Sequence, residues 1–498
     1  MNLGALYIAS AIREAGNEVV FIDLVRYLYS DIEIQDIIEA AKPALIAFTG
    51  IITTYYHLEL LSNMLRKTFG DVLQIVGGSL GPSAINLIEA NTSVDFICAG
   101  EGEEIIVDFI NEVKAEKRWS IVPNIYYREK GDFKASEVQN QYVRDLDSLA
   151  LPAYDLVDME FYISYTSSVF KEIFDPSHKP HRIMTIVCSR GCPYSCSFCY
   201  RLIKKWRHHS TENLINHLKV LKHDYGITSV VFNDELIFVD SEWFIEFCES
   251  LSKSNLDFSF SCGGGKSSLI TNEMLVAMKK SSFKRIGYGI ESGSPKILKA
   301  MNKGVSKEQN FHAIRLTLEH KMLSFSNIVF GHPGENKQTI KETFEFMDDV
   351  YKLQERYNVV DDNLQIWFAT AYPGTQIYEY ALSNGLIGDE REYLLSVTSQ
   401  NCYLLNLSEF SSISKLRNQV FRGIGWLNIK KYFRRKKIRL ALKEILRYFY
   451  NCCVYFGTFG KYASLSDLRL KNAKPINESL TFRGKLRKSF DKSKIVVS

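Results

Sequence analysis

The chain has 498 residues, a formal net charge of +4 and 24% charged residues. Such a length exceeds what one compact core supports, so we expect two or three domains, and so mild a charge does not indicate a nucleic-acid partner. No apolar run reaches the roughly 20 residues of a transmembrane helix, and no secretory signal pattern opens the chain. We therefore expect a cytoplasmic protein whose ten cysteines are reduced thiols or metal ligands.

The N-terminal region, residues 1–143, alternates short apolar runs with segments of helical period. The runs, each ended by a polar or Gly-rich turn, are residues 18–23, 44–50, 73–78 and 94–103. This alternation predicts an α/β domain with a doubly wound parallel sheet. Ligands of such sheets bind at the carboxyl ends of the strands, where several glycines fall. Any single glycine there is explained by a tight turn, but their joint placement favours a binding site.

A proline-containing segment, residues 144–182, is expected to be a linker. From residue 183 the alternation resumes, with six strand-plus-loop units separated by helical stretches. Six βα units predict a partial or full TIM-type α/β barrel over 183–395. The rest of the chain, 396–498, has a helical and basic pattern.

Within this C-terminal region, residues 428–450 interleave Lys and Arg with aromatic and aliphatic side chains. One interpretation is a solvated amphipathic helix docked on its own domain. The other is a surface that contacts an anionic membrane or covers an apolar substrate. The final residues, 482–498, are expected to be disordered.

Four cysteines occur in the stretch CSRGCPYSCSFCY, residues 188–200. Cys192, Cys196 and Cys199 form C-x-x-x-C-x-x-C directly after the first predicted barrel strand, at the end where barrel chemistry takes place. A structural zinc site needs four ligands, and no second C-x-x-C is present. Three thiolates on a 4Fe-4S cluster leave one iron open for a substrate or cofactor. Cys188 could be a fourth ligand, but its place at the strand end favours a small core residue.

This stretch resembles the signature of the radical S-adenosylmethionine (SAM) superfamily, C-x-x-x-C-x-aromatic-C. VVFNDELIF, YGIESGSPKILKAMNKG, GHPGE and AYPGTQIYEYALSNGLI are similar to later segments of its members. The resemblance implies a 4Fe-4S cluster on the three cysteines, SAM as cofactor, a small-molecule substrate and an electron donor such as flavodoxin or ferredoxin. The SAM-binding residues that it implies are Phe198, Asp234, Glu235, Lys266, Glu291 and Ser292.

Lys266 marks a departure from the family. Many members carry an arginine after the third strand to hold the SAM carboxylate, whereas this chain reads SCGGGKSSLIT there. Lysine is a point charge rather than a planar fork, so we expect this contact to be weaker or to be made elsewhere.

The N-terminal region resembles the cobalamin-binding domain of one large radical SAM branch, which includes cobalamin-dependent methyltransferases and tetrapyrrole cyclases. The segments that carry this resemblance are residues 3–24, 76–106 and 144–156. The cobalamin-binding residues that it implies are Thr49, Gly77, Gly78, Ser79, Gly100, Glu101 and Gly102. The D-x-H-x-x-G motif is absent and His57 lies in a helical stretch, so we expect cobalamin to bind without a protein histidine on cobalt.

The start of the chain falls where the first helix of such a domain should begin. We therefore expect either that translation begins further upstream or that the sheet has one strand fewer than usual.

Three hypotheses for function remain. The first is methylation of an unactivated carbon with SAM and cobalamin. The second is a radical cyclisation or rearrangement with the same cofactors, and the third is a non-catalytic iron-sulfur or zinc protein. Asp234, Glu235 and Glu291 would have little purpose under the third. No sequence feature separates the first two, because substrate contacts have no recognisable code.

Overall fold

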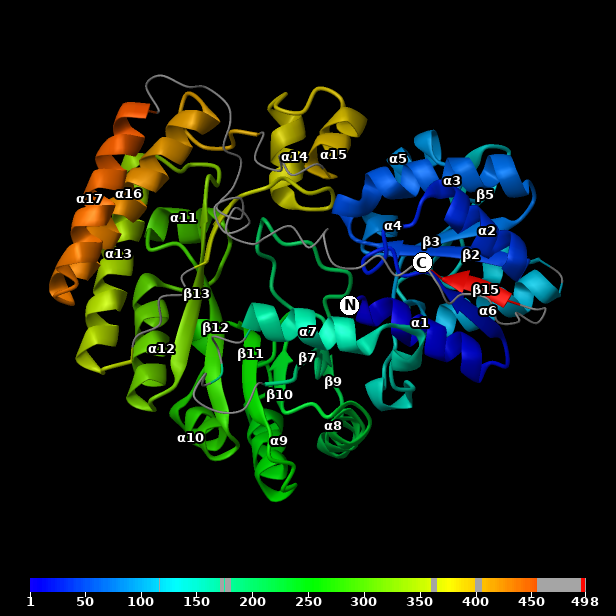
Figure 1. Ribbon diagram of the computed structural model, residues 1–498. Helices are drawn as coiled ribbons and strands as arrows, with labels where there is room; N and C mark the ends of the chain where they lie inside the picture. Colours follow the sequence, from blue (N-terminus) through cyan, green and yellow to red (C-terminus); the bar gives the residue numbers. More distant parts are fainter. Residues whose placement is uncertain are drawn as a thin grey trace.

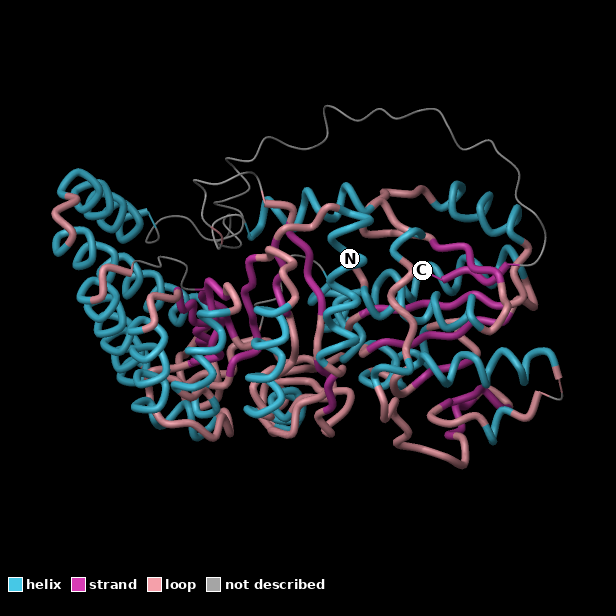
Figure 2. Tube along the Cα trace, turned by 90° about the horizontal axis from the view of Figure 1, so that it is seen from below, coloured by secondary structure: helices cyan, strands magenta, loops and turns pink. Residues whose placement is uncertain are grey.

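The computed structural model describes residues 1–115, 117–170, 174, 181–359, 365–398, 405–454 and 494–497. Figure 1 shows an N-terminal sheet wrapped by helices, a second, curved sheet beside it, and long helices at the opposite end of the molecule. The view from below places the two sheets side by side, with helices outside them (Figure 2). No helix of the described segments is long and apolar enough to cross a membrane.

The N-terminal sheet has seven strands in the order β1-β15-β2-β3-β4-β5-β6. These strands are β1 (Glu18–Phe21), β2 (Leu45–Gly50), β3 (Leu73–Gly78), β4 (Phe96–Cys98), β5 (Ile125–Glu129), β6 (Asp132–Ala135) and β15 (Lys494–Val497). The four predicted strands are present, and β2, β3 and β4 pair in parallel. The antiparallel hairpin of β5 and β6 extends the sheet beyond the predicted set.

Helices cover both faces of this sheet, as predicted for a doubly wound domain. They are α1 (Leu3–Glu14), α2 (Asp31–Ala41), α3 (Tyr55–Phe69), α4 (Leu80–Ser83), α5 (Ile85–Asn91) and α6 (Gly102–Lys114). Strand β2 shows why both faces need cover, because successive side chains of a strand point to opposite faces of the sheet. Ile46 and Phe48 join the apolar cluster that includes α2 and α3, while Leu45 and Ala47 join the cluster that includes α1 and α6.

Strand β15 comes from the far end of the chain and lies between β1 and β2, parallel to both. Its four residues pair with the whole of β1, from Glu18 to Phe21. The expectation of disorder over 482–498 is therefore wrong for Lys494–Val497, because an extended β-branched segment completes the backbone hydrogen bonds of this sheet. The remaining residues of that tail lie outside the described segments.

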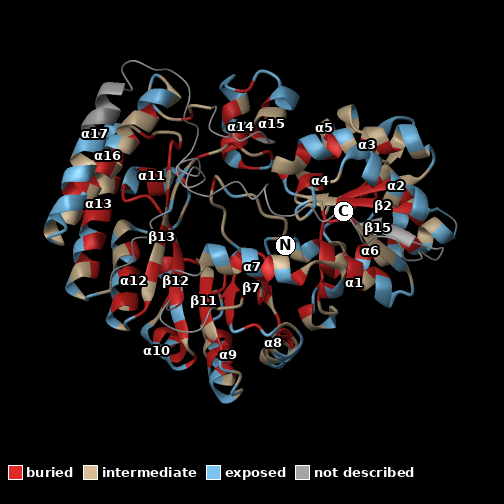
Figure 3. Ribbon diagram, viewed as in Figure 1, coloured by how far each residue is buried: buried red, intermediate tan, exposed pale blue. Residues whose placement is uncertain are grey.

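The second sheet is a curved half-barrel of six parallel strands in the order β14-β13-β12-β11-β10-β7. Its strands are β7 (Ile183–Ile186), β10 (Ser229–Phe232), β11 (Ser259–Gly265), β12 (Phe283–Glu291), β13 (Leu323–Phe330) and β14 (Gln365–Phe368). Its helices are α8 (Thr211–Tyr225), α9 (Ser241–Lys253), α10 (Asn272–Lys280), α11 (Pro295–Ala300), α12 (Lys307–Glu319) and α13 (Lys337–Arg356). All six predicted units are present, and buried residues concentrate along the strands (Figure 3).

The segments that flank the half-barrel are packed rather than extended. The predicted linker contains α7 (Met159–Phe170), which contacts β7. After β14, α14 (Gln376–Ser383) and α15 (Glu390–Thr398) pack into the apolar cluster of α2 and α3 in the N-terminal domain. Part of the predicted barrel segment 183–395 thus serves to join the two domains.

The basic stretch 428–450 is not one helix. It is divided between α16 (Ile413–Arg434) and α17 (Ile438–Val454). Arg434 on α16 lies 2.7 Å from an oxygen of Asp348 and 2.9 Å from one of Glu355, both on α13. For α16 the interpretation of a helix docked on its own domain is therefore confirmed.

Candidate functional site

Cys192, Cys196 and Cys199 lie on the loop that follows β7, at the carboxyl end of the half-barrel strands. The base of this loop is closed by a short antiparallel pair, β8 (Ser189–Arg190) with β9 (Arg207–His208). Gly191 has a φ of +87°, and a Cβ at this position would lie 2.2 Å from the carbonyl oxygen of Lys205. Only glycine fits this close approach, so the residue before the first cysteine fixes the shape of the loop.

The pKa values of two of the three cysteines, Cys192 and Cys199, are raised. Burial, together with the neighbouring Cys196, Glu235 and Cys192, raises the pKa of Cys199 to about 11. Burial also raises the pKa of Cys192, and Cys196 adds to this shift. Thiolates so placed need positive charge, which iron would supply.

Within the described residues no three His, Cys, Asp or Glu side chains converge closely enough to hold a single metal ion. In a 4Fe-4S cluster each thiolate binds a different iron, and the donor set of the loop fits this group.

A buried histidine supports the middle of the cysteine loop. The Nε2 atom of His332 lies 2.9 Å from the Oγ atom of Ser197. The backbone N–H of Ser197 donates to the carbonyl of Met301, and its carbonyl accepts from the N–H of Ile377. The GHPGE segment after β13 thus contacts the cysteine loop directly, which its sequence pattern alone does not reveal.

Asp234 and Glu235 follow β10 and have different surroundings. The Oδ1 atom of Asp234 accepts hydrogen bonds from the N–H of Cys188 at 2.9 Å and from the N–H and Oγ of Ser189 at 2.6 and 2.7 Å. Burial raises the pKa of Asp234 to about 6. Asp234 therefore holds the start of the cysteine loop, whereas Glu235 lines a cavity.

Cys188 is fully buried beside Asp234, which confirms its prediction as a core residue. Its Sγ atom lies 3.4 and 3.5 Å from the two carboxylate oxygens. Burial and this neighbouring carboxylate raise the pKa of Cys188 well above its usual value. The thiol is thus held protonated in the core, apart from the other three.

Two buried lysines lie beside the cysteine loop. Lys303 donates to the Oε1 atom of Glu291 at 2.9 Å, and Lys266 donates to the carbonyl of Lys303 at 2.5 Å. The ammonium of Lys266 also lies 3.7 Å from the ring centroid of Tyr194, which belongs to the cysteine loop. Glu291 has a φ of +63°, a strained conformation for a residue with a side chain. These cations and this carboxylate are the groups of the half-barrel that suit the charged end of SAM.

Two further predicted SAM residues are engaged by the protein itself. The Oγ atom of Ser292 lies 2.9 Å from that of Thr343 on α13 and also accepts from the N–H of Ser294. Phe198 packs against the apolar cluster of the N-terminal domain. Its ring lies 5.9 Å from the ammonium of Lys303.

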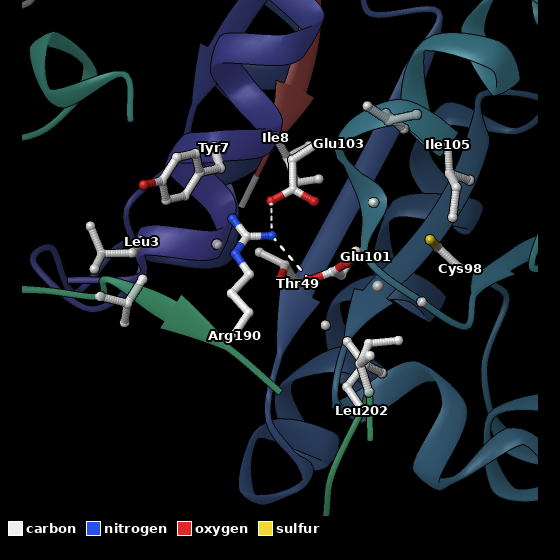
Figure 4. A pocket seen from close by; sticks show the side chains of 18 of the residues that line it. Leu3, Tyr7, Ile8, Thr49, Cys98, Glu101, Glu103, Ile105, Arg190 and Leu202 are labelled. Carbon is white, nitrogen blue, oxygen red and sulfur yellow. Dashed lines mark hydrogen bonds and ion pairs between the residues drawn. The ribbon is translucent and has the colours of Figure 1, made fainter. Parts of the chain in front are cut away.

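A cavity of about 350 Å³ lies between the carboxyl ends of the N-terminal strands and the loops of the half-barrel. Of the residues predicted to bind cobalamin, those that line it are Thr49, Gly77, Gly78, Gly100, Glu101 and Gly102. Ser79 is not among the lining residues. The half-barrel contributes Ser189, Gly191, Asn233 and Glu235. The cavity therefore brings Glu235, one of the predicted SAM-binding residues, to the predicted cobalamin-binding residues, but none of the three cysteines lines it. Figure 4 shows Thr49, Glu101 and Cys98 around it.

The walls of this cavity suit a large ligand that lies close to backbone atoms of the protein. A Cβ built on Gly77 would lie 3.7 Å from the Cβ of Cys98 and meet nothing closer, so this position is not filled by the protein's own packing. Tyr7, Ile8 and Ile105 add apolar surface. No histidine belongs to the lining, and His57 is exposed on α3. The described residues thus fit a cobalamin that takes no histidine from the protein.

Buried ion pairs join the two domains beside the cavity. The guanidinium of Arg207 donates to both oxygens of Glu101, at 2.7 and 3.0 Å. Arg190 lies 2.8 Å from Glu103 and 3.4 Å from Glu101 (Figure 4). Glu101 also accepts from the N–H of Val143. Glu101 could be predicted from the sequence but its arginine partners could not, because ion pairs between distant segments leave no local pattern.

Comparison with known families identifies both domains. Residues 186–347 match the model of the radical SAM superfamily. Residues 1–110 match the B12 binding domain. The two matches fall on the half-barrel and on the N-terminal sheet, in the predicted order.

Curated relatives match most of the chain at low identity. The chain is 25% identical over 389 residues to an uncharacterized methyltransferase of Pyrococcus horikoshii, covering 77% of this chain and 79% of the relative. It is 23% identical to the anaerobic magnesium-protoporphyrin IX monomethyl ester cyclase of Rubrivivax gelatinosus, covering 69% of this chain but only 61% of that enzyme.

Solved structures share the fold. The radical SAM methyltransferase TsrM of Kitasatospora setae, with tryptophan and a SAM analogue bound, superposes with a TM-score of 0.61 at 14% identity, over 77% of this chain and 73% of TsrM. The cobalamin-dependent radical SAM enzyme OxsB, with aqua-cobalamin and SAM bound, superposes with a TM-score of 0.62 at 19% identity. The match covers 95% of this chain and 73% of OxsB. At these identities the likeness is one of fold alone.

Proposed function

This chain is a radical SAM enzyme with an N-terminal B12-binding domain, and we propose that it methylates an unactivated carbon of a small-molecule substrate. The observation that carries the proposal is the shared cavity. It is lined by strand ends of the B12-binding domain and by Ser189, Gly191, Asn233 and Glu235 of the half-barrel. A methyl donor in one domain and a radical source in the other must meet at such a place.

The roles of the chain's own residues follow from their positions. Cys192, Cys196 and Cys199 hold the cluster, and Lys266 with the pair of Lys303 and Glu291 receives the charged end of SAM. When bound, the cluster supplies the electron that cleaves SAM, and cobalamin supplies the methyl group. The protein orients these groups across the cavity and excludes water from it. A flavodoxin- or ferredoxin-type protein would deliver the electrons.

The products of SAM test the proposal. The protein is reconstituted anaerobically with iron, sulfide and hydroxocobalamin, and is then incubated with SAM, reductant and extracts that contain candidate substrates. Methylation should yield 5'-deoxyadenosine and S-adenosylhomocysteine in equal amounts, because one SAM makes the radical and another restores the methyl donor. With SAM labelled on its methyl group, the label should appear in a substrate-derived product.

Cyclisation or rearrangement is the second candidate, favoured by the match to the cyclase of Rubrivivax gelatinosus. It would yield 5'-deoxyadenosine without S-adenosylhomocysteine and without transfer of the label. Formation of neither product from SAM would contradict both candidates and leave a non-catalytic iron-sulfur protein.

A further inference from the structure

Arg201 has buried N–H groups that find no acceptor. Its Nε and Nη1 atoms are shielded from solvent, and neither makes a hydrogen bond within the described part of the chain. Leaving charged donors buried and unpaired costs more free energy than leaving neutral ones. A group that the protein itself does not provide is therefore expected to accept from them.

The position of Arg201 indicates what that group is. The residue lies two positions after Cys199, on the cysteine loop. Its charge lies within electrostatic reach of the thiols of Cys192 and Cys199. The same holds for the carboxylate of Glu235, but no hydrogen bond joins the two side chains. The buried, unpartnered donors thus belong to the loop that carries the three thiols on which a cluster would be held.

The other cations near the loop already have partners. Arg207 and Arg190 pair with Glu101 and Glu103. Lys303 pairs with Glu291, and Lys266 donates to a backbone carbonyl. Arg201 therefore differs from its neighbours in holding buried donors that have no acceptor among the described residues.

We propose that Arg201 donates hydrogen bonds to sulfur atoms of the 4Fe-4S cluster and raises its reduction potential. The inference rests on the cluster in the proposed function. A cluster on three thiolates gains one negative charge when it is reduced, and a fixed cation stabilises that reduced state. Net charge and hydrogen bonds to sulfur are known means by which proteins set cluster potentials. Arg201 is thus a positioning residue that makes the cluster easier to reduce.

The test compares Arg201→Met and Arg201→Lys with the wild type. Lys204→Met is the matched control, because it removes one positive charge from an exposed position on the same loop. The full-length proteins are reconstituted anaerobically, their iron is counted, and the reduced cluster is followed by electron paramagnetic resonance during a redox titration without SAM.

All four proteins should carry the same iron. At a fixed potential the ratio of reduced to oxidised cluster should fall about tenfold in Arg201→Met, which for a one-electron couple is 59 mV. The ratio for Arg201→Lys should lie between those of the wild type and Arg201→Met, because lysine keeps the charge but lacks the planar guanidinium. Lys204→Met should match the wild type.

Other outcomes overturn the inference. An unchanged potential in Arg201→Met would do so, and weaker SAM binding with that unchanged potential would assign Arg201 to the SAM carboxylate instead. Loss of iron from both Arg201 variants would make the residue a folding element of the loop. Absence of iron from the reconstituted wild type would contradict the proposed function itself, and the inference with it.

Discussion

At the carboxyl end of β10, one carboxylate oxygen organises the start of the cysteine loop. The Oδ1 atom of Asp234 accepts from the N–H and the thiol of Cys188 and from the N–H and the hydroxyl of Ser189. The next residue, Glu235, lines the cavity, so these two adjacent carboxylates have different roles. Asp234 shapes the loop, and Glu235 lies in the wall of the cavity.

Replacing Asp234 with asparagine should remove a pH dependence of stability. Burial raises the folded pKa of Asp234 to about 6 from 3.8, so this carboxyl favours the folded state fully below pH 4 and loses that contribution as the pH rises through 6. Asparagine keeps the accepting oxygen. The free energy of unfolding in urea should therefore be measured for Asp234→Asn and for the wild type at both pH values. Relative to the wild type, that of Asp234→Asn should rise by about 3 kcal/mol from pH 4 to pH 7.

Asp155→Asn provides the control, because Asp155 forms an exposed pair with Arg13 and its removal should change stability by at most about 1 kcal/mol. A gap between Asp234→Asn and the wild type that is the same at both pH values would contradict the role of burial.

Replacing Cys192, Cys196 and Cys199 with alanine should abolish the cluster, since each would ligate one iron. Cys188→Ala is the matched control, because this thiol is buried in the core beside Asp234. Iron analysis and the visible spectrum after anaerobic reconstitution should give about four irons per chain in the control and none in the triple variant. Retention of the cluster by the triple variant would refute the assignment.

At the scale of elements, the end of β3 shows why glycine recurs in the N-terminal domain. Gly77 and Gly78 both line the cavity, but for different reasons. Gly78 has a φ of +71°, and a Cβ there would lie 2.6 Å from the carbonyl oxygen of Gly50. Gly77 has no such restriction, so its open position serves the cavity rather than the turn.

Gly77→Val should therefore reduce cobalamin binding without unfolding the domain. The new side chain has room in the protein but projects into space that the ligand would need. Cobalamin retained after desalting, measured by absorption, should fall at least tenfold while the circular dichroism spectrum stays the same. Gly388→Val, an exposed position with nothing within 4 Å, should retain cobalamin like the wild type. Equal retention by the two variants would argue against a corrinoid in this cavity.

Helix α16 docks on α13 through a close contact as well as through ion pairs. A Cβ on Gly423 would lie 2.0 Å from the ring of Phe344. Gly423→Ala should destabilise the protein by about 1 to 3 kcal/mol, because overpacking displaces one helix from the other. Denaturant unfolding measures this loss, and Phe344→Leu should restore part of it in the double variant. Additive losses in the double variant would mean that the two residues do not interact.

At the scale of the whole molecule, buried charges hold the two domains in a fixed relation. Arg207 follows the cysteine loop, and Glu101 directly precedes α6. Their bidentate pair is almost completely shielded, at 7% and 6% side-chain exposure. Since α14 and α15 also pack on the N-terminal domain, the cavity between the domains has walls on several sides.

Arg207→Met should cost up to about 3 to 5 kcal/mol, because the buried carboxylate of Glu101 loses its bidentate partner and keeps only Arg190 at 3.4 Å and the N–H of Val143. Arg13→Met, which removes an exposed pair with Asp155, should cost at most about 1 kcal/mol. Thermal unfolding compares the two, and limited proteolysis near residue 144 reports whether the domains separate. Adding Glu101→Gln to Arg207→Met should recover stability. Equal losses in the two single variants would contradict a buried interdomain clamp.

The sequence by itself determined the order of the two domains, ten of their parallel strands and the placement of the three clustered cysteines. These features depend on local signals, namely apolar runs of strand length, glycine turns and the C-x-x-x-C-x-x-C spacing. A strand end and its loop are neighbours in the chain, so the sequence also placed Thr49, Gly77 and Glu235 at the edges where ligands bind.

Only the tertiary structure decided which of those residues meet. That Asp234 is occupied by Cys188 and Ser189, that Glu101 is paired with Arg207, and that Arg201 is left with buried donors are facts about segments far apart in the chain. The insertion of β15 between β1 and β2 is of the same kind. Such pairings depend on burial and on geometry between elements, which no local pattern of residues encodes.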